Sequence, residues 1–319
     1  MNTPQRRRSA QTLVVRACVP VYLMSIVGIP LALSGWLVAV APTSWRMVMF
    51  ITVPALYCAC YVIVAGTLSR VTLASIVAGR FPRDLGHAVY GPRRLYALCW
   101  TAIYYCAPVY HAVLAVPALK RITFRLFGYR GSLDFQTYPD TWLRDLPLLT
   151  IGKGAYLSNK ATISPNMCLR NGKIIILPVS IGAGTMIGHL TMIAPGVEIG
   201  ADSEVGVGVA VGMRVRVGSR TLIDHEAVID HEVTIGDRCV IGTRSYIGRK
   251  AVVMDGLRLP PASVVPPRSI VATQADVDAL GSRAWATRFD GPSSIQMEPK
   301  LSSSANDDDR LSIGMRVLS

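Results

Sequence analysis

An aliphatic residue recurs at every sixth position from Ile151 to Val265, and this period strongly constrains the fold. Counting in sixes gives twenty aliphatic residues in succession, and ten of them are followed directly by glycine. A period of six fits neither an amphipathic helix, whose apolar residues repeat about every 3.6 residues, nor a strand, in which apolar and polar residues alternate. The pattern therefore indicates an internal repeat built from hexapeptides.

Hexapeptides of this kind predict a three-sided prism in which three repeats make one coil. Each aliphatic side chain points inward and stacks on its equivalents in the coils before and after, and the following glycine takes a backbone conformation that other residues resist. Stacking buries a continuous apolar column that no single hexapeptide can bury. We expect a parallel β-helix of nearly seven coils, with a protruding loop between Asn166 and Pro178, where Lys173 occupies an otherwise small position.

The first part of the chain is apolar and carries no charge over two long stretches, from Ala17 to Trp45 and from Met47 to Ser69. About 20 apolar residues span a bilayer core, so the two stretches predict a helical transmembrane hairpin. Because arginines flank the hairpin on both sides, the positive-inside rule places both of its ends in the cytoplasm. These arginines are Arg6, Arg7, Arg8 and Arg16 before the hairpin and Arg70, Arg80, Arg83, Arg93 and Arg94 after it.

A third uncharged stretch runs from Leu95 to Leu119 and has basic residues at both ends. Pro108 and Pro117 interrupt it, and aromatic residues are spread along its length. These features suit a re-entrant or interfacial segment better than a third span. The prism is then expected on the cytoplasmic side.

Three regions follow from these patterns. We expect a membrane domain over residues 1–130, a β-helix over 131–268 and a C-terminal tail over 269–319. The tail is predicted to begin with a short helix from Ala275 to Trp285 and to be disordered around residues 302–309. The chain is thus predicted to be a multi-pass protein of the inner (cytoplasmic) membrane.

The chain carries a net charge of +13, most of it in the first 150 residues. This charge suits contact with membrane lipids that are anionic, or with an anionic substrate carrier, and it also sets the topology of the hairpin. Nucleic acid is not an expected partner, because no recognition motif accompanies the charge. The seven cysteines show no zinc-ligand spacing and are expected as free thiols in a reducing compartment.

Three of the five histidines lie in the repeat, at His189, His225 and His231. Each comes two residues after an inward aliphatic residue, so all three are expected to project outward from the prism in comparable ways. Imidazole is the side chain whose pKa suits a general base at neutral pH. The alternative is a solvated histidine, or one that is hydrogen-bonded to a neighbouring coil, and this alternative is favoured for His189 taken alone.

The run 227–237 resembles the segment that bears the catalytic histidine in hexapeptide-repeat acyltransferases, most closely in sugar N-acyltransferases and lipid A acyltransferases. That family has a left-handed β-helix and usually forms homotrimers with acyl-thioester sites between subunits. The resemblance implies that His231 is the general base and that Asp230 or Glu232 orients its ring. His225, in the same coil, would assist or bind substrate.

Segments 124–128, 145–152 and 177–182 resemble the membrane-embedded terminal domain of poly-amino-acid synthetases such as polylysine synthetase. In those proteins, membrane helices alternate with hexapeptide-repeat modules that join an activated acyl group to an amine. This chain has a single module and neither an adenylation domain nor a carrier domain. The resemblance therefore implies an external donor, an acyl-CoA or acyl-carrier thioester, and no tightly bound cofactor.

These features together predict a membrane-anchored acyltransferase. The thioester is expected along the outside of the prism, where His231 takes a proton from a hydroxyl or amine of a small-molecule or lipid-linked acceptor. A backbone N–H at Gly242 or Gly248 would stabilise the oxyanion. His189 and His225 are expected to contact substrate, and no metal ligand is assigned.

Two other interpretations stay open. His189 and His225, stacked two coils apart, and segment 253–256 resemble gamma-class carbonic anhydrases, which bind zinc through three histidines. Asp230 stands where the third ligand is expected, and His231 comes one residue late, although zinc also accepts carboxylate. The other interpretation is a non-catalytic trimeric membrane scaffold, against which the four carboxylates close to His225 and His231 argue.

Overall fold

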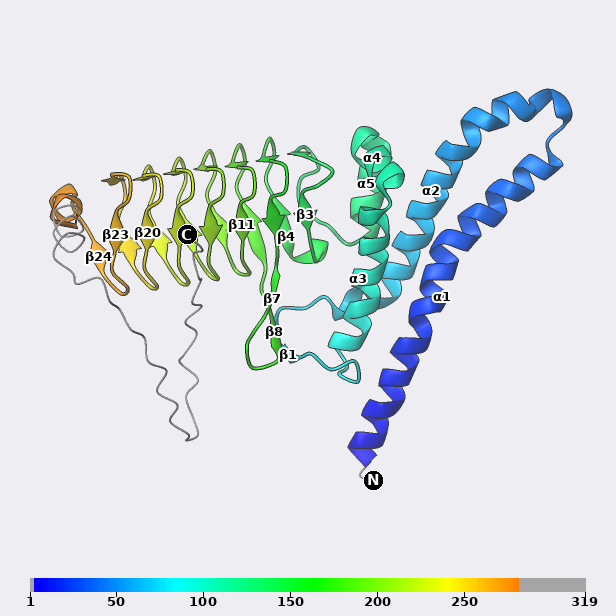
Figure 1. The fold of residues 1–319 in the computed structure, drawn as a ribbon, viewed down its shortest axis with the longest axis horizontal. Helices are drawn as coiled ribbons and strands as arrows, with labels where there is room; N and C mark the ends of the chain where they lie inside the picture. The colour runs from blue at the N-terminus through cyan, green and yellow to red at the C-terminus, as the bar shows by residue number, and fades with distance from the viewer. Residues whose placement is uncertain (1–2, 281–319) are drawn as a thin grey trace, which may run out of the picture.

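The chain folds into a long helical hairpin, a short helical cap and a three-sided prism that projects sideways from the cap (Figure 1). The computed structural model describes residues 3–280 of the 319. Within this range, residues 274–280 are helical, at the start of the predicted tail helix. The rest of that helix and the disordered stretch predicted at 302–309 lie outside the described residues.

The hairpin consists of two helices whose sequences are almost entirely apolar. Each is long and apolar enough to cross a membrane. Large side chains such as Met47 and Phe50 are exposed because no other part of the described chain covers them. The predicted pair of long apolar helices is confirmed. The elements are α1 (Thr3–Val40), the turn η1 (Thr43–Trp45) and α2 (Arg46–Thr72).

Three shorter helices form the cap that covers the first coil of the prism. The first two are bent by 84° where they meet, and Pro108 and Pro117 lie in the first turns of the second and third. The third apolar stretch is therefore broken, and its re-entrant or interfacial path stays a prediction. The elements of the cap are η2 (Leu73–Ser75), α3 (Tyr90–Tyr105), α4 (Ala107–Ala115) and α5 (Pro117–Leu126).

Aromatic packing fastens the cap to the prism. The indole N–H of Trp100 on α3 donates to the carbonyl of Leu143 in the first coil at 2.7 Å, and the ring packs edge-on against Phe124 and Phe127. Lys120 on α5 donates to two carbonyls at the entrance to that coil. One continuous apolar core runs from the helices to the last coil.

A buried ion pair completes the junction between cap and prism. Arg93 on α3 donates to the carboxylate of Asp145 in the first coil, and the two side chains are only 4% and 3% exposed. The amide of Asn166 donates to the same carboxylate. A charge held so deeply depends on its partner, because both ions have lost their water.

The prism is a left-handed parallel β-helix of three seven-stranded sheets (Figure 1). Beyond the second coil, successive coils pair with an offset of 18 residues, as between Met192 and Ala210. Inward positions such as Ile187 and Ile193 are buried, as the period predicts. The strands are short because the chain turns a corner after each of them.

The strands follow the six-residue period closely. The first sheet contains β2 (Gln136–Thr137), β5 (Tyr156–Leu157), β10 (Met186–Ile187), β13 (Glu204–Val205), β16 (Leu222–Ile223), β19 (Val240–Ile241) and β22 (Arg258–Leu259). The second contains β3 (Trp142–Leu143), β6 (Thr162–Ile163), β11 (Met192–Ile193), β14 (Ala210–Val211), β17 (Val228–Ile229), β20 (Tyr246–Ile247) and β23 (Val264–Val265). The third, entered through η3 (Leu146–Leu148), contains β4 (Leu149–Ile151), β9 (Val179–Ile181), β12 (Glu198–Ile199), β15 (Arg216–Val217), β18 (Thr234–Ile235), β21 (Val252–Val253) and β24 (Ile270–Val271).

An insertion of twelve residues interrupts the second coil and confirms the predicted protruding loop. Thr162 pairs with Met192, 30 residues further on, where the later coils have an offset of 18. Because twelve is a multiple of six, the count passes through the insertion unchanged. Leu169 and Ile175 are therefore wrong as inward residues of the prism. The inserted strands and their antiparallel partner are β7 (Asn166–Cys168), β8 (Lys173–Ile176) and β1 (Gly79–Pro82).

Candidate functional site

The residue two positions after each inward aliphatic residue sits at a corner of the prism. At two corners, a histidine ring accepts the backbone N–H of the equivalent residue one coil earlier. Nδ1 of His225 accepts from Val207 at 3.0 Å, and Nδ1 of His231 accepts from Met213 at 2.9 Å. Both histidines are therefore part of the bonding between coils, whatever else they do.

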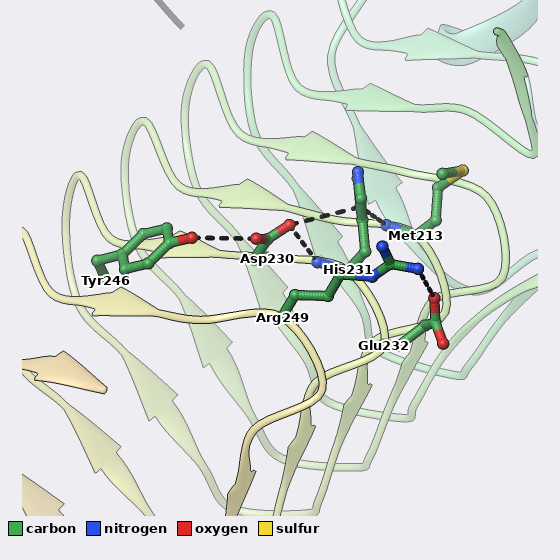
Figure 2. A network of polar contacts seen from close by, with 6 residues as sticks. All are labelled: Met213, Asp230, His231, Glu232, Tyr246 and Arg249. Atoms are coloured by element: carbon green, nitrogen blue, oxygen red, sulfur yellow. Dashed lines mark hydrogen bonds and ion pairs between the residues drawn. The ribbon is translucent and has the colours of Figure 1, made fainter. Parts of the chain in front are cut away.

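His231 is buried at its corner, whereas His225 is exposed. Only 11% of the His231 side chain is exposed, compared with 57% for His225. Met213 and Arg249, from the coils on either side, enclose the His231 ring (Figure 2). The two rings thus make equivalent bonds at their corners, but neighbouring side chains cover only His231.

Gly212 makes room for the ring of His231. A β-carbon at this position would come within 2.6 Å of Nδ1 and within 2.8 Å of the backbone nitrogen of His231. A β-carbon in a folded protein essentially never lies that close to another non-bonded atom. A larger residue at position 212 therefore displaces either the His231 ring or the coil. Glycine is needed here for the close approach of one coil to the next.

The bond from Met213 fixes the tautomer of His231. Because Nδ1 accepts a hydrogen bond, the neutral ring carries its hydrogen on Nε2, which points away from Met213 (Figure 2). Burial lowers the pKa of His231 below its usual value, Arg249 adds to this effect, and the charges of Asp230 and Glu232 oppose it. The side chain is thus neutral at pH 7 and presents an N–H donor.

Asp230 and Glu232 flank His231 but bond to other groups. Asp230 accepts the backbone N–H of His231 at 2.6 Å and the hydroxyl of Tyr246 at 3.0 Å, and its carboxylate lies 4.0 Å from Nδ1. Glu232 accepts from Arg249 at 2.9 Å, and this hydrogen bond lowers the pKa of Glu232. The backbone of the preceding coil, rather than either carboxylate, orients the ring (Figure 2).

Gly242 and Gly248 use their backbone N–H groups within the prism. Each donates to a carbonyl of the next coil at 2.9 Å. Neither N–H is therefore available as the oxyanion donor that was predicted from the sequence. The corner N–H of Arg249, one coil beyond His231, suits this role, because its counterpart in the next coil is Pro267, whose side chain has no acceptor.

The three histidines are not gathered into one cluster. His225 and His231 stand at opposite ends of β17, and His189 lies two coils earlier at the His225 corner. Over residues 3–280, no group of three or more His, Cys, Asp or Glu side chains is placed to hold a metal ion. The resemblance to gamma-class carbonic anhydrases thus gains no ligand set from the described residues.

The insertion hairpin forms a wall beside the His231 corner. Leu169 and Ile175 of the hairpin pack with Ala194 and Met213 in a small apolar cluster. β8 is held in turn by β1, which follows the helical hairpin in the sequence. The insertion hairpin beside the candidate site is therefore connected to the helical part of the chain by the pairing of β1 with β8.

Four of the residues that shape this site, Gly212, Met213, Tyr246 and Arg249, belong to no motif that indicates a role in it. Met213 and Arg249 lie 18 residues before and after His231, and Gly212 lies next to Met213. The offset of one coil is the signal that identifies them. Tyr246 is less predictable, because its bond to Asp230 depends on the reach of a flexible side chain between coils.

Comparison with known families identifies the repeats of the prism. Residues 214–249 match the model described as "Bacterial transferase hexapeptide (six repeats)". Residues 178–213 match "Hexapeptide repeat of succinyl-transferase". Together the two models match residues 178–249 of the prism. The first match contains both His225 and His231. A comparison with curated proteins gives no match.

Several solved structures show similarity to part of the chain. PerB from Caulobacter crescentus, solved with CoA and GDP-perosamine, is 19% identical over 28% of this chain and 42% of its own, with a TM-score of 0.27. A hexapeptide transferase family protein from Anaplasma phagocytophilum is 17% identical over 43% and 87%, with a TM-score of 0.32. The UDP-N-acetylglucosamine acyltransferase of Francisella novicida is 15% identical over 51% and 75%, with a TM-score of 0.33.

Proposed function

We propose that the protein is a membrane-anchored acyltransferase with His231 at its reacting centre. The observation that carries the proposal is the state of this side chain. His231 is buried, neutral and held in one orientation by Met213, within a segment that matches transferase hexapeptide repeats. A histidine that served only to join coils would not need burial, as the exposed His225 at the other corner shows.

The proposed reaction moves an acyl group from a thioester, either acyl-CoA or an acyl-carrier thioester, to a hydroxyl or amine. The acceptor oxygen or nitrogen bonds to the thioester carbonyl carbon, the carbon–sulfur bond breaks, and the acceptor proton ends on the departing thiol. As the carbonyl oxygen becomes an oxyanion, Nε2–H of His231 and the corner N–H of Arg249 are the donors that suit it. No metal or tightly bound cofactor takes part in this scheme.

The tautomer distinguishes this donor role from the general-base role that the family resemblance implies. A base at Nε2 requires the hydrogen on Nδ1, where it would face the N–H of Met213, another donor. The donor role keeps that bond. We therefore favour the donor role, with Asp230 and Glu232 tuning the charge around the ring.

The proposed setting is the cytoplasmic face of the inner membrane. The long apolar helices α1 and α2 supply the anchor, and arginines at both ends favour the cytoplasmic side for the prism. A homotrimer is proposed because the outward face of the second sheet, between the His225 and His231 corners, is uncharged. Its outward residues are Trp142, Thr162, Met192, Ala210, Val228, Tyr246 and Val264.

Binding and cleavage of acyl-CoAs by the detergent-purified full chain test the proposal. We expect acetyl-CoA or a longer acyl-CoA to bind and to release thiol once a suitable amine or hydroxyl is added. His231→Ala should abolish release without unfolding the protein, and His225→Ala is the matched control. No thioester binding by the wild type, or full activity of His231→Ala, would overturn the proposal.

Two further measurements separate the remaining alternatives. Glutamine at position 231 keeps an N–H donor but has no basic nitrogen, so activity of His231→Gln well above that of His231→Ala supports the donor role. Equal loss in both variants supports the base role. Metal analysis of the same sample tests the resemblance to gamma-class carbonic anhydrases, since stoichiometric zinc without thioester binding would favour a gamma-class hydratase site.

A further inference from the structure

A pocket of about 790 Å³ lies where the helical hairpin meets the cap and the first coil. The end of α2 and the turn η2 form one side of it, and the end of α5 with the segment that follows forms the other. Three arginines line the pocket, Arg70, Arg125 and Arg130, and no acidic residue does. The remaining wall is mainly apolar, with Leu73 and Ile76 among its residues.

The three arginines carry positive charges that no described residue neutralises. Arg125 donates to the carbonyls of Tyr129 at 2.8 Å and Gly131 at 3.2 Å, and Arg70 donates to the carbonyl of Arg125 at 2.5 Å. These acceptors are uncharged. Within residues 3–280, no ion pair involves any of the three arginines. Three like charges around one cavity repel each other, so an anion in the cavity would relieve the repulsion.

Two of the arginines, Arg70 and Arg125, are held in position by hydrogen bonds to backbone carbonyls. The carbonyl bonds fix the position of the Arg125 guanidinium but use only part of its five N–H donors. The planar guanidinium group matches the oxygens of a phosphate, to which it donates two parallel hydrogen bonds. The chemistry of the pocket therefore suits a phosphate ester.

The surroundings indicate where the phosphate comes from. Arg70 lies in the last turn of α2, one of the two helices long enough to cross a membrane. The neighbouring side chains of Val71 and Val77 are 75% and 40% exposed, which suits contact with lipid rather than water. We propose that this pocket binds the phosphate group of an anionic membrane lipid, whose acyl chains lie along the apolar wall.

This site is separate from the His231 corner. Along the second sheet, β17 beside His231 is four strands from β3 in the first coil. At about 4.8 Å between strands, the two sites are on the order of 20 Å apart along the prism. The lipid site rests on the proposed membrane anchoring, whereas acyl transfer at His231 can fail without affecting it.

Binding of short-chain lipids to the detergent-purified full chain tests the proposal. Native mass spectrometry or thermal shift would compare dioctanoyl phosphatidic acid, dioctanoyl phosphatidylcholine and inorganic phosphate. We expect the phosphatidic acid to bind more tightly than the other two, with an affinity that falls as salt is added. Arg130→Gln, which breaks no hydrogen bond seen in the structure, should weaken binding about tenfold or more, as loss of a charged hydrogen bond does.

The control is Arg121→Gln, an exposed arginine of α5 outside the pocket that gives the same change of charge. It should leave binding of the phosphatidic acid unchanged. Equal binding of inorganic phosphate would replace the lipid with a soluble phosphate and overturn the proposal. Equal losses in Arg121→Gln and Arg130→Gln, or no binding of the phosphatidic acid, would also overturn it.

Discussion

Replacement of Gly212 by alanine tests whether the fixed orientation of His231 matters. The added β-carbon would lie 2.6 Å from Nδ1 of His231 and 2.8 Å from backbone atoms of Asp230 and His231. The ring then has to leave the N–H of Met213, and an unpaired buried N–H costs about 1–3 kcal/mol. Overpacking of the two coils costs about 1–3 kcal/mol more. We expect the free energy of unfolding to fall by about 2–6 kcal/mol.

The effect on activity is the decisive part of this prediction. If the orientation of His231 is essential, Gly212→Ala should lose thioester cleavage to the level of His231→Ala while remaining folded. Gly206→Ala is the matched control, because its β-carbon would lie 2.8 Å from Nδ1 of His225. Thermal unfolding followed by circular dichroism, and thiol release from acetyl-CoA, measure the two effects. Comparable activity in the two variants would refute the reasoning, since both disturb the prism in the same way.

Three other predictions follow from single contacts. Arg93→Met leaves the buried carboxylate of Asp145 without its cation and should lower the free energy of unfolding by about 3–5 kcal/mol. Arg94→Met, at an exposed position, should change it little, and equal shifts of the unfolding temperature in the two variants would contradict this. Burial lowers the pKa of His231 in the folded protein, so the unfolded chain takes up a proton first as the pH falls through about 6.5. The free energy of unfolding should therefore be at its full value above that pH and decrease below it. The same dependence of stability on pH in His231→Gln would contradict this. Tyr246→Phe removes one hydrogen bond to Asp230 and should lower the free energy of unfolding, measured by thermal unfolding, by about 0.5–1.5 kcal/mol. A loss of thiol release as large as that of His231→Ala would instead place Tyr246 at the reacting centre.

The period of six predicts the prism because burial of the aliphatic column is a property that every coil repeats. It also predicts which residues lie at corners, and so places His225 and His231 at the two ends of one strand. It misplaces Leu169 and Ile175 because an insertion of twelve residues leaves the count intact while the chain leaves the prism. Lys173, at a position otherwise held by small residues, indicates a loop, and the pairing of strands shows that twelve residues leave the prism there.

The environment of His231 is harder to predict, because identical corner positions give different outcomes. His225 and His231 have the same spacing from an inward residue and accept equivalent backbone N–H groups, yet the His225 side chain is exposed and the His231 side chain is buried. The difference comes from Met213 and Arg249 in the adjacent coils (Figure 2), and Met213 packs in turn against the inserted hairpin. The burial of His231 is thus a property of three coils together, which no six-residue pattern describes.

The continuity of the apolar core between helices and prism has a practical consequence for fragments of this protein. A piece of the chain beginning near residue 131 would contain every coil, but its first strands would have unpaired edges that promote aggregation. It would also expose the face of Leu143 and Leu146 that the aromatic cap covers, and it would deprive Asp145 of its ion-pair partner Arg93. The boundary near residue 130 therefore separates helices from strands, but not one independently folding unit from another.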